Sequence, residues 1–177
     1  IRDSIDPSRQ RSSHVHTVVV DPAAPTRIYA ADLGGDAVYT LTVSLATGKL
    51  TRVGMAVAAP GSGPRHLAVH PSKRVLYVLH EMANQLTALA ISPAGDLSPL
   101  GPPISTLPPN ASIGSCVGLS DIGGGGEAVE ARETPCSKAA EVVVTRDGTA
   151  VFASNRGYGT PLTNTVAGFG VAAENGK

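Results

Sequence analysis

The chain lacks an excess of charge of either sign, and it lacks any apolar stretch long enough to cross a bilayer. Its 14 Lys and Arg residues balance its 14 Asp and Glu residues, which argues against a nucleic-acid or polybasic membrane surface. The apolar runs fall far short of the roughly 18 residues that a membrane-spanning helix requires. We therefore expect neither nucleic acid nor a membrane as a partner.

Several familiar catalytic and metal-binding motifs are missing too. The glycine run 123–126 lacks the Lys-Ser/Thr that completes a P-loop, and Gly61-Ser62-Gly63 lacks the spacing of a nucleophile elbow. His14 and His16 point to the same face of a strand, but no clear third ligand accompanies them. We expect no metal and no cofactor.

Turn-forming residues are abundant. Gly (20) and Pro (14) make up about a fifth of the 177 residues, which favours many turns and few long helices. The hydrophobic share is 42%, and at this length it suffices for one domain with a real core.

One pattern recurs three times along the chain. Each copy has a polar opener, three or four apolar residues, a turn, and a second apolar run that ends in a polar tip. The copies read HVHTVVVDPAAPTRIYAADLGGD from His14, RHLAVHPSKRVLYVLHEMANQ from Arg65 and AEVVVTRDGTAVFASNRGYG from Ala140. Val18, Leu67 and Val142 are equivalent, at steps of 49 and 75 residues. A step of about 40–50 residues with several strands is typical of a β-propeller blade.

The copies predict an all-β protein built from short antiparallel strands. In the first copy we expect strands over 16–20, 27–31, 37–43 and 50–57, the first of them buried on both faces. In the second we expect strands over 67–69, 75–79 and 86–91 and from 97 onward. The blade repeats span about 14–60, 64–103 and 139–177 of a single partial domain, 1–177, and 104–138 is expected to be an irregular surface insertion.

Three copies cannot close a ring, because propellers close with about 4–8 blades. We therefore expect three to four blades here, as about half of a longer chain. In isolation such an open fan would expose sheet faces at both ends, and we expect it to be unstable or to self-associate.

The repeat also indicates a site. Aligning the copies with the fixed steps places His16, Arg65 and Ala140 at one position, just before the first apolar run. It places Asp32, Glu81 and Arg156 at a second position, where the second strand ends. In an antiparallel meander these two positions lie at the same end of the sheet, so together they would form a rim around the central channel. Each residue alone could be an ordinary polar loop tip, but their correspondence favours a polar ligand site.

These residues carry a resemblance to a known family. The order SRQ, HVHTVVVDP, ADLGGD, GSGPRHLAVHP, YVLHE, EVVVTRDGTAVFASNRG resembles the seven-bladed propeller lactonases, a family that includes 6-phosphogluconolactonases and carboxy-cis,cis-muconate cyclases. The resemblance implies a small lactone or carboxylate substrate. It also implies catalytic roles for four residues: His16, Arg65, Glu81 and Arg156. We assign four neighbours to substrate binding: His14, His66, Asp32 and Asn155.

The residue types suit metal-free hydrolysis of a sugar-acid lactone such as 6-phosphogluconolactone. Two arginines can bind carboxylate or phosphate and stabilise an oxyanion. His16 titrates near neutrality, and Glu81 could orient it or act as the base. The same groups could lactonise a muconate, and a non-catalytic binding propeller stays open as a third reading.

The cysteines leave the compartment open from residues alone. Cys116 and Cys136 would fit a disulfide in a secreted chain, and Asn110 begins a glycosylation sequon between the repeats. Two free thiols would fit a cytosolic chain. The family resemblance favours the cytosol, so we expect a cytoplasmic protein with free thiols. His70 and His80 are expected to be hydrogen-bonded structural residues.

Overall fold

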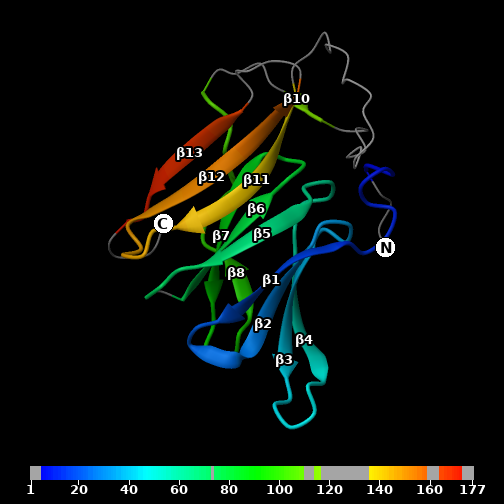
Figure 1. Cartoon of the computed structure of the whole chain (residues 1–177), viewed down its shortest axis with the longest axis vertical. Helices are drawn as coiled ribbons and strands as arrows, with labels where there is room; N and C mark the ends of the chain where they lie inside the picture. The colour runs from blue at the N-terminus through cyan, green and yellow to red at the C-terminus, as the bar shows by residue number, and fades with distance from the viewer. Residues whose placement is uncertain (1–4, 73, 110–113, 117–135, 159–163, 173–177) are drawn as a thin grey trace.

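The computed structural model describes residues 5–72, 74–109, 114–116, 136–158 and 164–172. Every regular element among them is a β-strand, and the strands form three sheets (Figure 1). The expectation of an all-β protein is thereby confirmed. The glycosylation sequon at Asn110 and the glycine run 123–126 lie outside the described residues.

Each sheet is an antiparallel meander in chain order, and we call the three sheets the first, second and third blade. The first blade contains β1 (Val15–Asp21), β2 (Ala24–Asp32), β3 (Ala37–Val43) and β4 (Leu50–Val57). These strands match the expected ones to within three residues at each end, because alternating apolar residues and Gly or Pro turns bound them closely.

The other two blades repeat this order with one departure each. The second blade contains β5 (Pro64–Val69), β6 (Val75–His80), β7 (Gln85–Ile91) and β8 (Leu97–Pro99), and β9 (Ile104–Ser105) pairs with the other half of β7. The third blade contains β11 (Cys136–Val144), β12 (Ala150–Tyr158) and β13 (Thr165–Gly170), with β10 (Gly114–Ser115) parallel to β11. Two short strands thus lie where an irregular insertion was expected.

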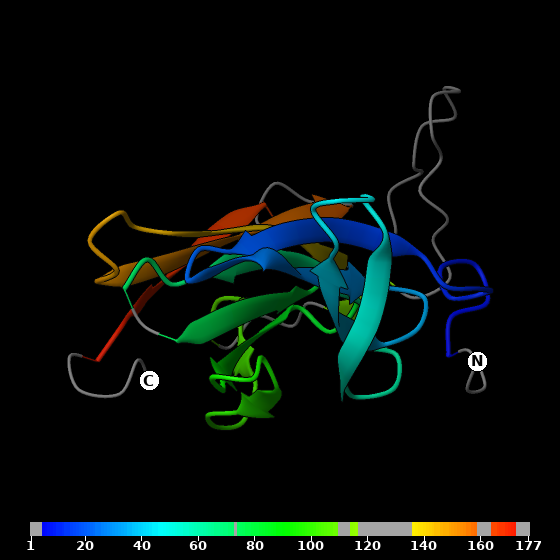
Figure 2. The same cartoon turned by 90° about the horizontal axis from the view of Figure 1, so that it is seen from below.

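The blades fan out from their first strands. β5 contacts β1 on one side and β11 on the other, so the three innermost strands lie next to one another. From this row the sheets splay apart, as the turned view shows (Figure 2). Radial antiparallel blades around a shared axis are the architecture of a propeller.

The second blade is the centre of the core because both of its faces are covered. All six residues of β6 are buried, and they alternate between the two neighbours. Leu76 and Val78 pack toward the first blade, in a cluster that includes Tyr29. Tyr77 and Leu79 belong to the cluster with the third blade. A strand buried on both faces reads as a continuous apolar run, which VLYVLH does.

The expectation that β1 is buried on both faces is wrong. Val18 is 63% exposed and Val20 is 56% exposed, whereas Val19, on the opposite face, packs against the core. The β-branched composition of the strand correctly predicted a strand. It could not show that one of the two faces has no neighbouring blade among the described residues.

At the ends of the blades farthest from the predicted rim, polar side chains join one blade to the next. Arg74 of the second blade donates to Asp21 of the first at 3.3 Å. His70 Nε2 lies 3.0 Å from the backbone oxygen of Gly148 in the third blade. His70 is 2% exposed, so the expectation of a hydrogen-bonded structural histidine is confirmed. These contacts fix the angle between the blades, and hence the positions of the residues at the opposite ends.

Candidate functional site

Two of the predicted site residues lie at β-bulges of adjacent inner strands. The β1–β2 register shifts between Val15 and Thr17, which leaves His16 as the extra residue. The β5–β6 register shifts between Pro64 and His66, which leaves Arg65 as the extra residue. A bulge bends the strand and redirects a side chain, and bulges are over-represented next to active sites.

The third blade has its bulge at the same place. The β11–β12 register shifts between Ala139 and Val142, so Ala140 and Glu141 occupy the position of His16 and Arg65. The alignment of His16, Arg65 and Ala140 in the sequence therefore corresponds to a shared backbone feature. Each blade has a β-bulge at the same position of its inner strand, and the residue at the bulge differs from blade to blade.

Glu81 lies directly after β6 and is fully buried beneath three arginines. Arg9 Nη2 donates to its Oε1 at 2.8 Å. Arg65 Nε and Arg156 Nη2 donate to its Oε2 at 2.7 and 3.0 Å. The three guanidiniums come from the N-terminal segment, from β5 and from β12, so one carboxylate joins three separate parts of the chain.

The geometry around Glu81 suits a positioning role. Both of its oxygens accept N–H bonds, and its side chain is 0% exposed, so a substrate cannot reach it without breaking the cluster. Arg156 remains 37% exposed and Arg65 14% exposed. Three positive charges share one negative charge, so the cluster retains capacity to bind an anion. We therefore interpret Glu81 as the holder of the arginines, not as the base.

Histidines line the arginine cluster. The rings of His16 and His66 lie 5.1 Å apart, edge to face, and the ring of the exposed His14 lies 6.2 Å from that of His16. His66 Nε2 is 3.1 Å from Arg65 Nη1, and His66 Nδ1 is 2.7 Å from Glu141 Oε1. Because arginine can only donate, His66 Nε2 accepts and its Nδ1–H donates to Glu141.

The electrostatics keep His16 neutral. Burial lowers the pKa of His16 from its usual value of 6.5, and the positive charge of Arg65 lowers it further, while Glu81 opposes both. At neutral pH the imidazole of His16 is therefore uncharged, and its unprotonated nitrogen can accept a proton. Burial raises the pKa of Glu141, but its hydrogen bonds with His66 and the Val142 backbone outweigh burial and lower it, so Glu141 stays ionised.

Asp32 is not the structural equivalent of Glu81, and the fixed-step alignment is wrong by one residue there. In the first blade Val18 pairs with Ala30, whereas in the second Leu67 pairs with Val78. The chain from Val18 to its partner Ala30 is therefore one residue longer than the chain from Leu67 to its partner Val78. Asp32 therefore corresponds to His80, and Leu33 corresponds to Glu81.

Asp32 and Asn155 were both assigned to substrate binding. In the structure both are buried, and their side chains form hydrogen bonds within the protein. Asp32 is 0% exposed and accepts the Ser13 hydroxyl at 2.7 Å, the His14 backbone N–H at 2.7 Å and the Gly35 backbone N–H at 2.9 Å. These bonds hold the pKa of Asp32 below its usual value although burial raises it.

Asn155 behaves in the same way in the third blade. It is 4% exposed, accepts the Thr106 hydroxyl at 2.7 Å and donates its amide N–H to the Thr106 backbone oxygen at 2.7 Å. Asp32, His80 and Asn155 thus occupy one repeat position, and each clamps the segment that leads into its blade. The next residue in each blade, which is Leu33, Glu81 or Arg156, occupies the following repeat position.

The sequence analysis did not predict two members of the cluster, Arg9 and Glu141. Arg9 precedes the first repeat, so the repeat gave no position for it, although it belongs to the SRQ opener of the resemblance. It is held in place because Gln10 donates to the Leu33 backbone oxygen at 3.0 Å. Glu141 follows Ala140 within the bulge of β11, and its Oε1 lies 2.7 Å from His66 Nδ1.

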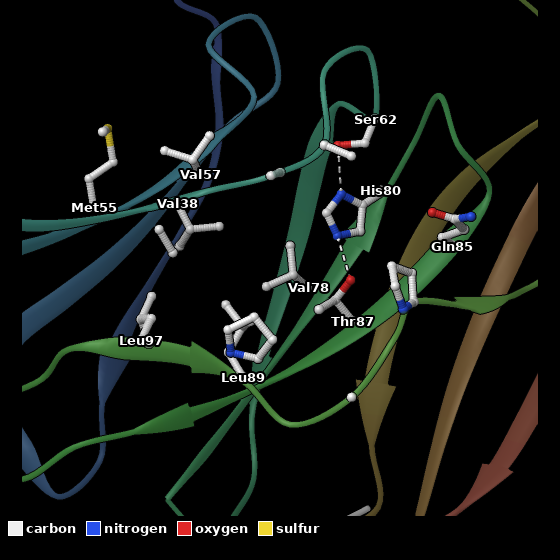
Figure 3. A pocket seen from close by; sticks show the side chains of 16 residues that line it. Val38, Met55, Val57, Ser62, Val78, His80, Gln85, Thr87, Leu89 and Leu97 are labelled. Atoms are coloured by element: carbon white, nitrogen blue, oxygen red, sulfur yellow. Dashed lines mark hydrogen bonds between the residues drawn. The ribbon is translucent and has the colours of Figure 1, made fainter.

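A pocket of about 490 Å³ lies elsewhere, between the outer strands of the first and second blades (Figure 3). Its walls are mostly apolar, and its polar end is the chain of Ser62, His80 and Thr87. His80 Nδ1 is 3.1 Å from the Ser62 hydroxyl, and Nε2 is 2.9 Å from the Thr87 hydroxyl. Because these groups satisfy one another, we place the site at the arginine cluster. Burial lowers the pKa of His80 to about 4, and its expected structural role is confirmed.

Within the described residues, no group of three or more His, Cys, Asp or Glu side chains is arranged to hold a metal ion. In the same part of the chain, no helix is long and apolar enough to span a membrane.

The expectation of free thiols is wrong. Cys116, beside β10, is bonded to Cys136, the first residue of β11. Both side chains are buried, and the bond adjoins the parallel pairing of β10 with β11. The spacing of 20 residues in the sequence allowed this pairing but did not require it.

Fold and site together define the chain as part of a β-propeller with an arginine-rich rim. The family model for the seven-bladed β-propeller lactonases matches residues 2–177, and the chain belongs to this family. The resemblance stated from the motifs is therefore confirmed.

Three similar proteins illustrate this membership. A 6-phosphogluconolactonase of Bacillus subtilis is 32% identical over 151 residues, which are 85% of this chain and 36% of that protein. A carboxy-cis,cis-muconate cyclase of Neurospora crassa is 37% identical over 86 residues, 48% of this chain and 23% of that one. The solved periplasmic gluconolactonase of Pseudomonas aeruginosa shares the fold with a TM-score of 0.72 at 24% identity, covering 95% of this chain and 40% of that one. The chain thus spans well under half the length of these proteins.

Proposed function

We propose that this chain supplies the arginine-rich part of a lactonase site that hydrolyses a sugar-acid lactone such as 6-phosphogluconolactone. The observation that carries the proposal is the buried Glu81 with its three arginines beside the neutral His16. The Bacillus subtilis relative, named as a 6-phosphogluconolactonase, supports the substrate class.

The chemistry divides between the two kinds of side chain. Arg156, the most exposed of the three arginines, binds the anionic group of the substrate. Arg65 stabilises the negative charge that develops on the carbonyl oxygen when water attacks. Glu81 holds both guanidiniums in place, so little reorganisation is needed during the reaction.

His16 serves as the base. It takes a proton from the attacking water as the oxygen bonds to the carbonyl carbon, and the imidazolium then returns that proton to the ring oxygen when the lactone C–O bond breaks. The pKa of His16, lowered by burial and by Arg65, keeps the imidazole in its accepting form at neutral pH. No metal is required in this scheme.

One assay tests the proposal on the full-length protein that contains this chain: hydrolysis of 6-phosphogluconolactone by that protein and by its Arg65→Ala and Arg156→Ala variants. We expect kcat/KM to fall by a factor of about 100 or more in each, as for loss of an oxyanion or anion-binding donor. Arg146→Ala is the matched control, because Arg146 is exposed in the turn at the other end of the third blade. Equal rates in all four proteins would contradict the site.

A second reaction has its own support. The Neurospora crassa relative is named as a carboxy-cis,cis-muconate cyclase, and arginines that bind carboxylates would suit a muconate as well as a sugar phosphate. Assaying the same four proteins with a carboxymuconate separates the two. Turnover of the muconate without hydrolysis of the lactone would assign the chain to the cyclases.

We propose further that the protein works in an oxidising compartment rather than in the cytoplasm. The bond between Cys116 and Cys136 supports this, because disulfides persist mainly in secreted and periplasmic proteins. The Pseudomonas aeruginosa neighbour is named as a periplasmic enzyme. Fractionation of the native host, with the protein detected in the cytosol only, would contradict it.

A further inference from the structure

Two consecutive residues of the second blade contact two consecutive residues of the third. Arg65 Nη1 donates to the backbone oxygen of Ala140, and His66 Nδ1 lies 2.7 Å from Glu141 Oε1. Arg65 is the extra residue of the β5 bulge, and Ala140 and Glu141 lie within the β11 bulge. The β11 bulge therefore supplies one acceptor to the arginine and another to the histidine beside it.

The carboxylate of Glu141 is anchored by the backbone around it. Its Oε1 also accepts the backbone N–H of Val142 at 2.8 Å, and the backbone N–H of Glu141 donates to the Ser154 hydroxyl at 3.2 Å. An ionised carboxylate can only accept hydrogen bonds. The bond between Glu141 and His66 therefore requires that Nδ1 of the imidazole carry the proton.

The tautomer of His66 decides whether Arg65 finds an acceptor on that side. His66 Nε2 lies 3.1 Å from Arg65 Nη1, and a guanidinium nitrogen can only donate. A neutral imidazole has a single N–H, and the partner of one ring nitrogen determines the state of the other. When Glu141 holds the proton on Nδ1, Nε2 accepts from Arg65. With the proton on Nε2, two N–H groups would face each other and this bond would be lost.

His66 also touches the base of the proposed reaction. Its ring meets the ring of His16 edge to face, with the centroids 5.1 Å apart. Within the described part of the chain, the hydrogen bonds of the Glu141 carboxylate go to His66 and to the backbone of Val142. An effect of Glu141 on Arg65 is therefore transmitted either through the imidazole of His66 or through charge alone.

We propose that Glu141 is a positioning residue, which fixes the tautomer of His66 so that His66 holds Arg65 in place. The same imidazole, packed against His16, then supports both groups that carry out the chemical step. This role rests on the proposed lactone hydrolysis. It gives the third blade a second contribution to the site, besides Arg156.

Kinetics of the full-length protein that contains this chain test the role. We expect Glu141→Ala to lower kcat/KM for 6-phosphogluconolactone about tenfold, mostly through kcat, as for one hydrogen bond lost in the transition state. Glu141→Gln should lose less, because its amide oxygen still accepts from Nδ1. Asp96→Ala is the matched control, since Asp96 is an exposed carboxylate in the turn between β7 and β8.

Two results of these assays would overturn the proposal. One is a rate in Glu141→Ala equal to that of the wild type and of Asp96→Ala. The other is a loss in Glu141→Gln as large as the loss in Glu141→Ala, because the effect would then come from charge and not from the acceptor.

A second substitution separates this role from a merely structural one. His66→Gln places an amide oxygen near the position of Nε2, where it accepts from Arg65 without help from Glu141. We therefore expect His66→Gln to rescue the loss, so that adding Glu141→Ala to it lowers kcat/KM by less than about twofold. Equal losses in both backgrounds would show that Glu141 acts independently of His66, and the proposal would fall.

The tautomer is measured without any reaction. Nitrogen NMR of the full-length protein with isotope-labelled histidine distinguishes protonated from unprotonated ring nitrogens, and the spectrum of His66→Gln identifies the signals of His66. We expect the proton on Nδ1 in the wild type and both tautomers in Glu141→Ala, and this measurement decides if His66→Gln proves inactive. A proton on Nε2 in the wild type would overturn the proposal whatever the protein hydrolyses. The expected tautomers without lactone hydrolysis would contradict the proposed function alone.

Discussion

Arg65 donates its Nε hydrogen to Glu81 Oε2 at 2.7 Å, and this bond joins the bulge of β5 to the residue that follows β6. It fixes the plane of the guanidinium at the rim of the channel, because Arg65 also donates to the backbone oxygen of Ala140 in the next blade. The arginine is thereby held from two sides before any ligand arrives. Such preorganisation is what an oxyanion-binding group requires.

Removing the charge of Glu81 should destabilise the protein as well as the site. We expect Glu81→Gln to lower the free energy of unfolding by about 3 kcal/mol, because three guanidiniums would lose their shared buried partner. Glu141→Gln makes the same chemical change at a carboxylate that is 55% exposed, and should cost under about 1 kcal/mol. Urea titration at one fixed protein concentration measures both, and equal losses would contradict the central role of Glu81.

Arg9 should matter although it lies outside the repeats. Its side chain is 9% exposed and satisfies Glu81 Oε1, so Arg9→Ala should lower the free energy of unfolding by roughly 1–3 kcal/mol. Arg11→Ala is the control on the same segment, because Arg11 is exposed. Urea titration and the kcat of lactone hydrolysis provide two readouts. A variant indistinguishable from Arg11→Ala in both would show that the N-terminal segment does not contribute to the site.

His80 should make the protein sensitive to acid. Its pKa is about 4 in the folded protein, so below pH 6.5 the unfolded chain binds a proton that the folded chain refuses. Stability is therefore unaffected above pH 6.5 and falls between pH 6.5 and about 4, by up to about 3 kcal/mol.

The comparison with His80→Gln isolates this effect. Glutamine can still bond to Ser62 and Thr87, but it does not titrate. Urea titrations at pH 7 and pH 4 should show a smaller loss in the variant than in the wild type. Parallel losses in both proteins would mean that His80 is not the residue that responds to acid.

Reduction of the disulfide should weaken the third blade. Cys116 and Cys136 close a loop with a sequence separation of 20, for which the chain-entropy estimate is about 3 kcal/mol of stabilisation. We expect the thermal midpoint to fall on adding reductant, and the Cys116→Ser/Cys136→Ser double variant to melt at the reduced value with or without it. Thiols that react with an alkylating reagent in the unreduced, denatured protein would contradict the bond.

The blade repeat was readable in the sequence because its physical basis is local. Alternation of apolar residues, β-branched runs and Gly or Pro turns fix a strand without reference to distant residues, and the strand expected over 75–79 is present as β6. The bulge position was also accessible, because His16, Arg65 and Ala140 stand at equal distances before equivalent apolar residues.

The alignment at the far ends of the second strands could not be predicted from the sequence, since the hairpin of the first blade has one more residue between Val18 and Ala30 than the second blade has between Leu67 and Val78. Asp32 looked like the counterpart of Glu81 and is instead the counterpart of His80. A polar residue at a strand end looks the same in sequence whether it clamps the backbone, as Asn155 does, or faces the channel, as Arg156 does.

The sequence by itself determined the strands, the meander of each blade and the residue types at the rim, because these follow from neighbouring residues and short turns. Only the tertiary structure decided that Arg9 and Arg156, which lie at opposite ends of the chain, meet on the carboxylate of Glu81. It also decided which valines are core and which are surface. Both depend on how the blades pack side by side, and that packing joins residues too far apart in the chain for any local pattern to relate them.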